Sequence, residues 1–246
     1  MMDRLIYIAM TGAKHASQQQ ATVANNLANA STPGFKEQLA ASRAVAAVGG
    51  AGYASRSFTL EQTIGTDFSA GALQTTGRDL DIALKTDGFF AVQTSSGEAY
   101  TRAGGLQVDA NGILRSRSGD PVLGDAGPIT IPENSKISIG ADGTVSAASI
   151  SNPSQANQVG RIKLVKPDER TLDRGADGLF RPRDGQPAPV NETVQLASGA
   201  LESSNVNAVG QLVKMIDYQR NYDMQVRLLQ AADQNARAAA AVMSLS

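Results

Sequence analysis

Heptad-spaced residues at both ends of the chain constrain its fold more than any other feature. The N-terminal positions alternate in steps of four and three, and only Gln20 is polar: Met2, Ile6, Ala9, Ala13, Ala16, Gln20, Val23, Leu27 and Ala30. The C-terminal positions keep the same rhythm: Leu212, Met215, Gln219, Tyr222, Val226, Leu229, Asp233, Ala236, Ala240 and Met243. This spacing is typical of a helix whose narrow apolar stripe packs against another helix. We therefore expect two long terminal helices whose stripes pair with each other and with neighbouring copies.

The expected helix bounds follow from local signals. The first helix should cover about residues 3–30, because Pro33 disfavours helix in the preceding residue and Gly34 is a flexible stop. The last helix should begin at Ser204 or Asn205, both good N-caps, and run to about Met243. Alanine-rich stripes bury little area, and most helical stability comes from packing. We expect the terminal helices to be largely disordered in the free subunit and to fold on assembly.

The segment between the helices divides into a connector and a β-rich region. Residues 35–79 are rich in Ala, Gly, Ser and Thr, which predicts an extended connector with a short helical piece at 39–48. Residues 80–202 hold short apolar segments separated by turns such as Asn111-Gly112, which predicts an antiparallel barrel or sandwich-like module. The expected fold class is therefore α+β and multi-domain: a discontinuous terminal-helix coiled-coil domain (1–34 with 203–246), a connector (35–79) and a middle β domain (80–202).

Composition argues against several classes of protein. A net charge of −1, with basic and acidic residues mixed, is unlike a nucleic-acid binder. The absence of Cys excludes disulfides and thiolate metal sites. No apolar run reaches the about 20 residues of a membrane helix. The apolar run at residues 5–10 is too short for a cleaved signal peptide, so work outside the cytoplasm would need another export route.

The sequence offers few groups for chemistry. His15 is the only histidine and lies beside the N-terminal stripe, where we expect a helix-surface contact rather than a metal ligand or a catalytic triad. Residues 109–112 resemble the start of a calcium loop but lack the later ligands, so we expect a hairpin turn. Carboxylates at Asp79, Asp81 and Asp87 leave one distant alternative, an enzyme that uses them as acid and base. We expect no catalytic residue, cofactor or metal.

Three motifs remain to be explained: ANNLANASTPGFK at residues 24–36, LDIAL with GFFAV at 80–84 and 88–92, and GALESSNV at 199–206. In this order they resemble the signatures of bacterial flagellar axial proteins, which are the rod, hook and hook-associated subunits. The chain is too short for a hook protein. It most resembles the proximal-rod subunit, on its version of the first motif and the 39–48 segment that follows. The chain departs from the commoner family pattern at Asn207-Ala208, which replaces an acidic position, and at 220–222, which match only part of the usual Arg-x-Tyr-Glu run. These departures disfavour a distal-rod subunit, which together with other hook-basal-body axial subunits is the alternative.

The resemblance implies a function and a set of partners. A rod subunit is exported without a cleaved signal by the flagellar type III apparatus and assembles helically, in the periplasmic space, into a hollow drive shaft that transmits torque and encloses the export channel. Its partners are copies of itself and other rod subunits, with no nucleic acid, no small-molecule substrate and no membrane span; the enzyme alternative would be a periplasmic wall-cleaving one. The residues expected to mediate assembly are Ile6, Ala9, Ala13, Ala16, Val23, Asn25, Asn26, Leu27, Asn29, Thr32, Pro33, Gly34, Phe35, Leu201, Glu202, Ser204, Asn205, Val206, Leu212, Met215, Tyr222, Val226 and Leu229.

Overall fold

The computed structural model describes residues 2–46, 57–150 and 155–243. The chain divides into two compact units. The helical unit contains Met1–Ala30, Glu37–Asp67 and Val206–Ser246, and the β-rich unit contains Ser31–Lys36 and Phe68–Asn205. The stretch expected to be a connector is thus shared, with 37–67 in the helical unit, and 35–36 and 68–79 in the β-rich unit.

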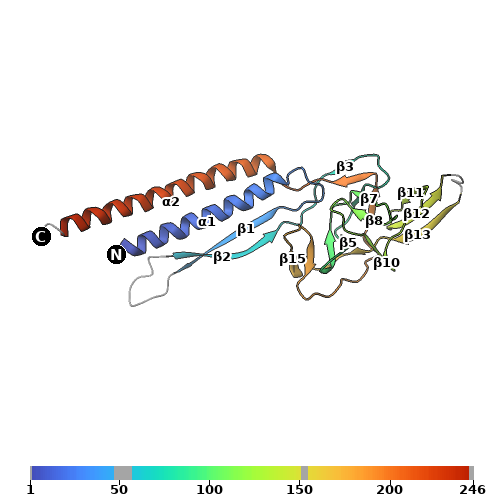
Figure 1. Ribbon diagram of the computed structural model, residues 1–246, viewed down its shortest axis with the longest axis horizontal. Coiled ribbons are helices and arrows are strands. Elements are labelled where there is room, and N and C mark those ends of the chain that lie inside the picture. Colours follow the sequence, from blue (N-terminus) through green and yellow to red (C-terminus); the bar gives the residue numbers. More distant parts are fainter. Residues whose placement is uncertain (1, 47–56, 151–154, 244–246) are drawn as a thin grey trace. The chain divides into compact units, whose positions relative to one another are not determined.

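Two long helices, α1 (Met2–Ala28) and α2 (Ala208–Met243), lie side by side in the helical unit and run in opposite directions (Figure 1). The prediction of two terminal helices is confirmed. The second helix starts later than expected, because its cap is Asn207: the Asn207 side-chain oxygen accepts a hydrogen bond from the Gly210 amide at 3.0 Å. In the described part of the chain, neither helix is long and apolar enough to cross a membrane.

A two-stranded antiparallel ribbon, β1 (Gln38–Ala46) and β2 (Ser57–Thr66), completes the described part of the helical unit. The expected short helix at 39–48 is therefore wrong where the structure describes it, and residues 47 and 48 lie outside the described residues. Helix propensity is a weak preference that tertiary context overrides. Here β1 is extended because it pairs with β2. The Asn26 side chain also forms two hydrogen bonds with the backbone of Gln38.

The β-rich unit is a set of small antiparallel sheets. The largest has the order β14-β5-β6-β16-β15, a second has the order β11-β12-β13, and the pairs β3–β18, β4–β17, β7–β8 and β9–β10 complete it. Its elements are β3 (Leu73–Thr75), β4 (Ile82–Leu84), β5 (Phe89–Thr94), β6 (Gly97–Thr101), β7 (Leu106–Val108), β8 (Leu114–Ser116), β9 (Leu123–Gly124), β10 (Gly127–Pro128), β11 (Ser135–Ile139), β12 (Thr144–Ser149), β13 (Ala156–Arg161), β14 (Leu164–Val165), the 3-10 turn η1 (Glu169–Thr171), β15 (Leu172–Arg174), β16 (Phe180–Pro182), β17 (Leu196–Ser198) and β18 (Ala200–Glu202).

The prediction of an antiparallel β region is confirmed, but the described strands form no closed barrel. Strands of two to six residues, interrupted by turns, pair locally and do not continue around a single sheet. One of these turns is the stretch that resembled a calcium loop. It joins β7 to β8, and its Asp109 carboxylate accepts the amides of Asn111 and Ile113 and the Arg115 Nε at 2.6 Å. The hairpin interpretation is therefore the right one.

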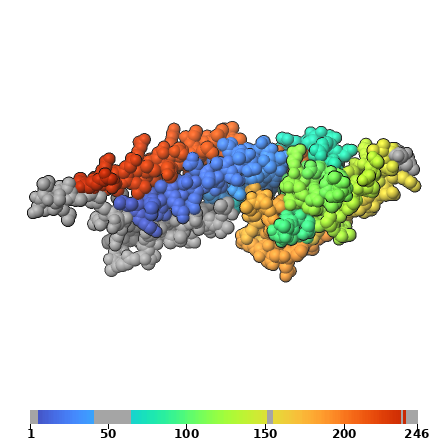
Figure 2. Space-filling view, in the orientation of Figure 1, coloured from blue at the N-terminus to red at the C-terminus, as the bar shows by residue number. Residues whose placement is uncertain are grey.

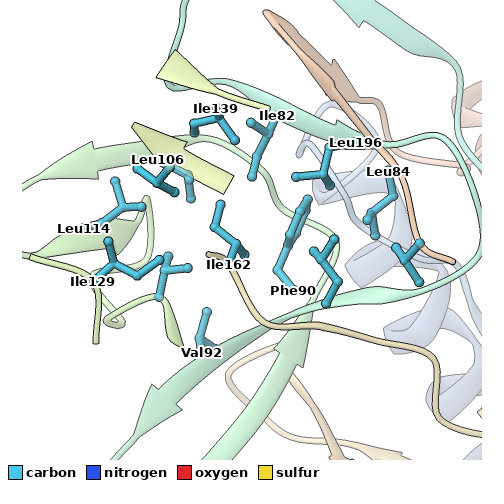
Figure 3. Close-up of a cluster of buried hydrophobic side chains, with 14 of the residues drawn as sticks. Ile82, Leu84, Phe90, Val92, Leu106, Leu114, Ile129, Ile139, Ile162 and Leu196 are labelled. Atoms are coloured by element: carbon cyan, nitrogen blue, oxygen red, sulfur yellow. The ribbon is translucent and has the colours of Figure 1, made fainter. Parts of the chain in front are cut away.

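Two hydrophobic clusters form the core of the β-rich unit. The larger brings together residues from strands far apart in sequence, and Figure 3 shows Phe90, Ile162 and Leu196 pointing toward one another. The smaller is aromatic, with Phe89, Phe180 and the half-buried Phe68 in ring contact. Leu196 lies just before the last motif of the chain, so the core is complete only when the C-terminal segment has returned to it.

Candidate functional site

The first and third sequence motifs meet in the β-rich unit. The Gly34 amide donates to the Glu202 carbonyl at 2.8 Å, and the Asn205 amide donates to the Phe35 carbonyl at 3.3 Å. Gly34 has a φ of +72°, and a Cβ at this position would collide with the backbone of Arg102 and Ala103. Both the left-handed conformation and the close approach require glycine.

A buried ion cluster lies at this meeting point, and we call Lys36, Arg102 and Glu202 the clamp. The Lys36 Nζ lies 2.6 Å from one Glu202 carboxylate oxygen, and an Arg102 Nη lies 3.2 Å from the other. All three side chains are at most 2% exposed. The Lys36 Nζ also donates to the Ser69 carbonyl at 2.7 Å, and the Gly71 amide donates to Glu202 at 2.9 Å. One carboxylate thus holds two cations and one backbone amide.

The clamp ties together four stretches of chain that are distant in sequence: 34–36, 69–71, the stretch around Arg102, and 202–205. Buried ion pairs lose hydration free energy and are weak evidence for net stability, but they penalise arrangements in which a charge loses its partner. Arg102 is not fully satisfied in the clamp, because no described residue accepts a bond from its buried Nε. Its guanidinium carbon lies 5.4 Å from the Phe89 ring centroid. We infer that the clamp fixes the path of the chain and performs no chemistry.

Phe35 is held by a cation above its ring. The Arg174 guanidinium carbon lies 4.2 Å from the ring centroid, and Arg174 also donates to the Lys36 carbonyl at 2.7 Å. Burial lowers the pKa of the Arg174 guanidinium. The aromatic residue of the first motif therefore has a packing role next to the clamp.

Asn26 fixes the path of the chain in the helical unit, as the clamp does in the β-rich unit. Its side-chain amide donates to the Gln38 carbonyl and accepts the Gln38 amide, both at 2.9 Å, so it pairs with the start of β1 as another strand would. Asn29 closes the end of α1, because its side chain donates to the Asn25 carbonyl at 2.9 Å. Nearby, the buried Gln211 donates to the Glu37 carboxylate at 2.7 Å. These side-chain amides satisfy backbone and carboxylate groups near the end of α1 and the start of α2.

The stripe on α1 is turned inward. Ala9, Ala13, Ala16 and Val23 are buried, and Ile6 and Leu27 are half-buried. The small residues allow close approach: a Cβ added to Gly12 would come within 2.9 Å of the Gln225 side chain. Their participation in assembly stays a prediction.

The covered side of α2 agrees with the heptad positions predicted from the sequence at some residues and differs at others. Met215, Val226 and Leu229 are half-buried as expected, whereas Leu212 and Tyr222 are exposed. The buried positions Gln211 and Ala232 were missed. The sequence pattern predicts Leu212 and not Gln211 in the stripe because Leu212 is apolar. Gln211 can be buried because Glu37 accepts its hydrogen bond.

A second apolar stripe lies on the side of α2 away from these buried positions. Val209, Leu212, Val213 and Ile216 are spaced i, i+3, i+4 and i+7, so they share one helix face, and each is between 47% and 72% exposed. We call these four residues the outer α2 face. Exposed apolar clusters of this kind mark protein–protein contacts.

The remaining predicted residues lie around the clamp or on the helix ends. Thr32, Pro33, Leu201 and Ser204 are exposed or half-buried, and Val206 is buried at 9% exposure. Nothing in the sequence pointed to Arg102, which belongs to none of the three motifs. Its role depends on a contact with Glu202 across 100 residues of sequence.

The groups considered for chemistry are scattered. Asp81 is buried beside Arg78 at 3.6 Å, whereas Asp79 and Asp87 are exposed. The His15 Nε2 lies 2.8 Å from the side-chain amide of Gln19 on the same helix. Among the described residues, no group of three or more His, Asp and Glu side chains could hold a metal ion.

Family models of flagellar proteins match three parts of the chain. Residues 6–36 match "Flagella basal body rod protein", residues 83–147 match "Flagellar hook protein FlgE/F/G D1 domain", and residues 197–242 match "Flagellar basal body rod FlgEFG protein C-terminal". The first and third matches include Lys36 and Glu202 of the clamp.

Individual relatives match over the full length. The flagellar basal-body rod protein FlgF of Escherichia coli (strain K12) is 44% identical, and that of Salmonella typhimurium (strain LT2) is 43% identical, each over all of both chains. The flagellar basal-body rod protein FlgG of Bacillus subtilis (strain 168) is 32% identical over 95% of this chain and 96% of that protein. The chain therefore belongs to the family of flagellar basal-body rod proteins, which are structural proteins and not enzymes, and within it the chain is most like the proximal-rod subunits.

Proposed function

We propose that this structural subunit works by helical assembly into the hollow drive shaft of the flagellum, which transmits torque and encloses the export channel. The observation that carries this proposal is the outer α2 face. Four large apolar side chains lie on a helix whose opposite side already packs against α1, so they are available to a neighbour. A subunit of a rod needs contacts of this kind on more than one side.

The helices carry the assembly in this proposal. α1 and α2 pair as a coiled coil through the alanine-rich stripe of α1 and the covered side of α2, and neighbouring copies pack on the sides left exposed. The clamp and Asn26 keep the ends of the terminal segments in fixed places. Torque is then resisted by many weak contacts that act together.

Partners and location follow from the family. The partners are copies of this chain and other rod subunits, and the type III export apparatus carries the chain, without a cleaved signal, to the periplasmic space where the rod stands. Full-length identity to FlgF of two bacteria supports the proximal rod, and the match to FlgG keeps the distal rod as the alternative.

Substitution of the outer α2 face tests the proposal. In the source bacterium with its own gene deleted, the triple variant L212S/V213S/I216S should keep the wild-type circular dichroism spectrum but be missing from isolated basal bodies, and swimming should be lost. The matched control R220S/R227S/Q230S changes three exposed polar positions of the same helix and should be incorporated. Normal incorporation of the apolar triple variant would refute the role of this face.

A further inference from the structure

We propose that the outer α2 face binds the side of α1 that carries Tyr7 and Met10 in a second copy of this chain, displaced by about 25 Å along the helix axis. The inference rests on the proposed function, because it names the contact by which copies assemble. It adds the partner surface and the axial offset. The two copies run in the same direction because the proposed rod relates its copies by a screw operation.

The partner surface is an exposed apolar pair on α1. Tyr7 and Met10 are three residues apart, so they lie on the same side of the helix, and they are 56% and 53% exposed. The buried stripe of α1 begins at Ala9 on another side. In Figure 2, α1 (blue) and α2 (red) lie along each other, so the two helices cover each other on one side. α1 also contacts β1 and β2.

The offset follows from the contacts between α1 and α2 within one molecule. The Gln20 side chain donates to Gln219 at 2.9 Å, and Gly12 faces the Gln225 side chain. Because the helices are antiparallel, the centre of the outer α2 face lies level with about residue 26 of α1. Tyr7 and Met10 lie about 17 residues away, which is about 25 Å at 1.5 Å per residue.

One molecule cannot bring its own two surfaces together over that distance. A second copy, placed alongside in the same direction and shifted by the offset, brings Tyr7 and Met10 of one copy onto the outer α2 face of the other. Each copy then keeps one surface for the next neighbour, so the contact is heterologous and the array stays open. Pairing of two outer α2 faces would instead close a dimer and leave Tyr7 and Met10 exposed.

The small area of the contact also favours an array over a dimer. Stable complexes bury about 800 Å² per partner. Two side chains on α1 and four on α2, each already about half covered, offer less than that. A single contact is therefore weak, and stability comes when every copy uses both surfaces.

Cysteine cross-linking tests the contact on a clean background, because the chain contains no Cys. The M10C/V213C variant is expressed in the source bacterium without its own copy, and isolated basal bodies are oxidised and examined on a non-reducing gel. Within one molecule the two positions are about 22 Å apart along the axis, far beyond the about 7 Å limit between Cα atoms for a disulfide. The expected result is a ladder of covalent multimers that contain only this chain.

The matched control is S17C/V213C. Ser17 is exposed and lies seven residues after Met10, on the same side of α1 and about 10 Å further along the axis. This variant should give monomer only. If only the M10C/V213C protein failed to incorporate, the contact would be supported, because the two variants differ at the α1 position alone.

Four results would overturn the inference: monomer from incorporated M10C/V213C, a ladder from S17C/V213C instead, cross-links to a different rod protein, or dimers from V213C alone, which would indicate pairing of two α2 faces. Failure of the proposed function gives a different result, since the wild-type chain would then be missing from basal bodies.

Discussion

Replacement of Glu202 by Gln should destabilise the β-rich unit more than any other single change in the clamp. Gln has the same shape but no charge, so two cations, Lys36 and Arg102, would remain buried without a counter-ion. Removal of one partner from a buried ion pair costs about 3–5 kcal/mol. The Gln oxygen can still accept the Gly71 amide, which limits the loss to that range. For a unit of this size we expect the melting temperature to fall by about 10 °C or more.

The other clamp positions give an internal comparison. K36M removes one of two cations and leaves Glu202 paired with Arg102 at 3.2 Å, so the buried charges then balance. We expect K36M to cost less than E202Q, although the Ser69 carbonyl loses the Lys36 donor and keeps the Asn205 side-chain donor. The control is D173N, which breaks the exposed Asp173–Arg183 pair, with side chains 60% and 54% exposed; such pairs contribute about 0–1 kcal/mol.

Chemical denaturation of the purified chain measures these differences, and hydrogen exchange at residues 69–71 locates them. E202Q should shift the denaturation midpoint and speed exchange at the Gly71 amide, whereas D173N should do neither. The reasoning is wrong if E202Q costs under about 1 kcal/mol, or if K36M is the more damaging variant.

Three further predictions concern backbone and titration. G34A should destabilise the β-rich unit by more than about 2 kcal/mol, since its Cβ adds a collision to the strained φ, whereas G185A, at φ +69° with nothing within 4 Å, should cost about 1 kcal/mol in urea denaturation. The Arg115 side chain and backbone amides lower the pKa of the Asp109 carboxyl, so its stabilisation is present above the ordinary Asp pKa and lost as pH falls through the folded pKa; D109N should be less stable than wild type at pH 7, and the two should converge in acid. Burial raises the pKa of Tyr100 to about 12, so ultraviolet titration should show a late-ionising tyrosine that is absent in Y100F, with its stability contribution lost as pH rises from about 10 through 12.

The two helices and the antiparallel character of the middle region could be predicted from the sequence, because both depend on local periodicity. A heptad repeat predicts that α1 and α2 are helices with one covered stripe each, and turn dipeptides such as Asn111-Gly112 determine where a hairpin reverses. The motifs also marked Asn26, Lys36 and Glu202 before their contacts were visible.

What these residues do was decided only by tertiary structure. Which side of α2 is covered depends on what packs against it: Glu37 accepts a hydrogen bond from Gln211, so a polar residue is buried and Leu212 faces outward. Gln38–Ala46 is a strand and not a short helix, because Asn26 and β2 supply its hydrogen-bond partners. Arg102 has no signal in the sequence, since its role arises only where folding brings it to Glu202. Periodicity can be read from the sequence alone, whereas the partner of a buried charge depends on contacts between residues that are far apart in the sequence.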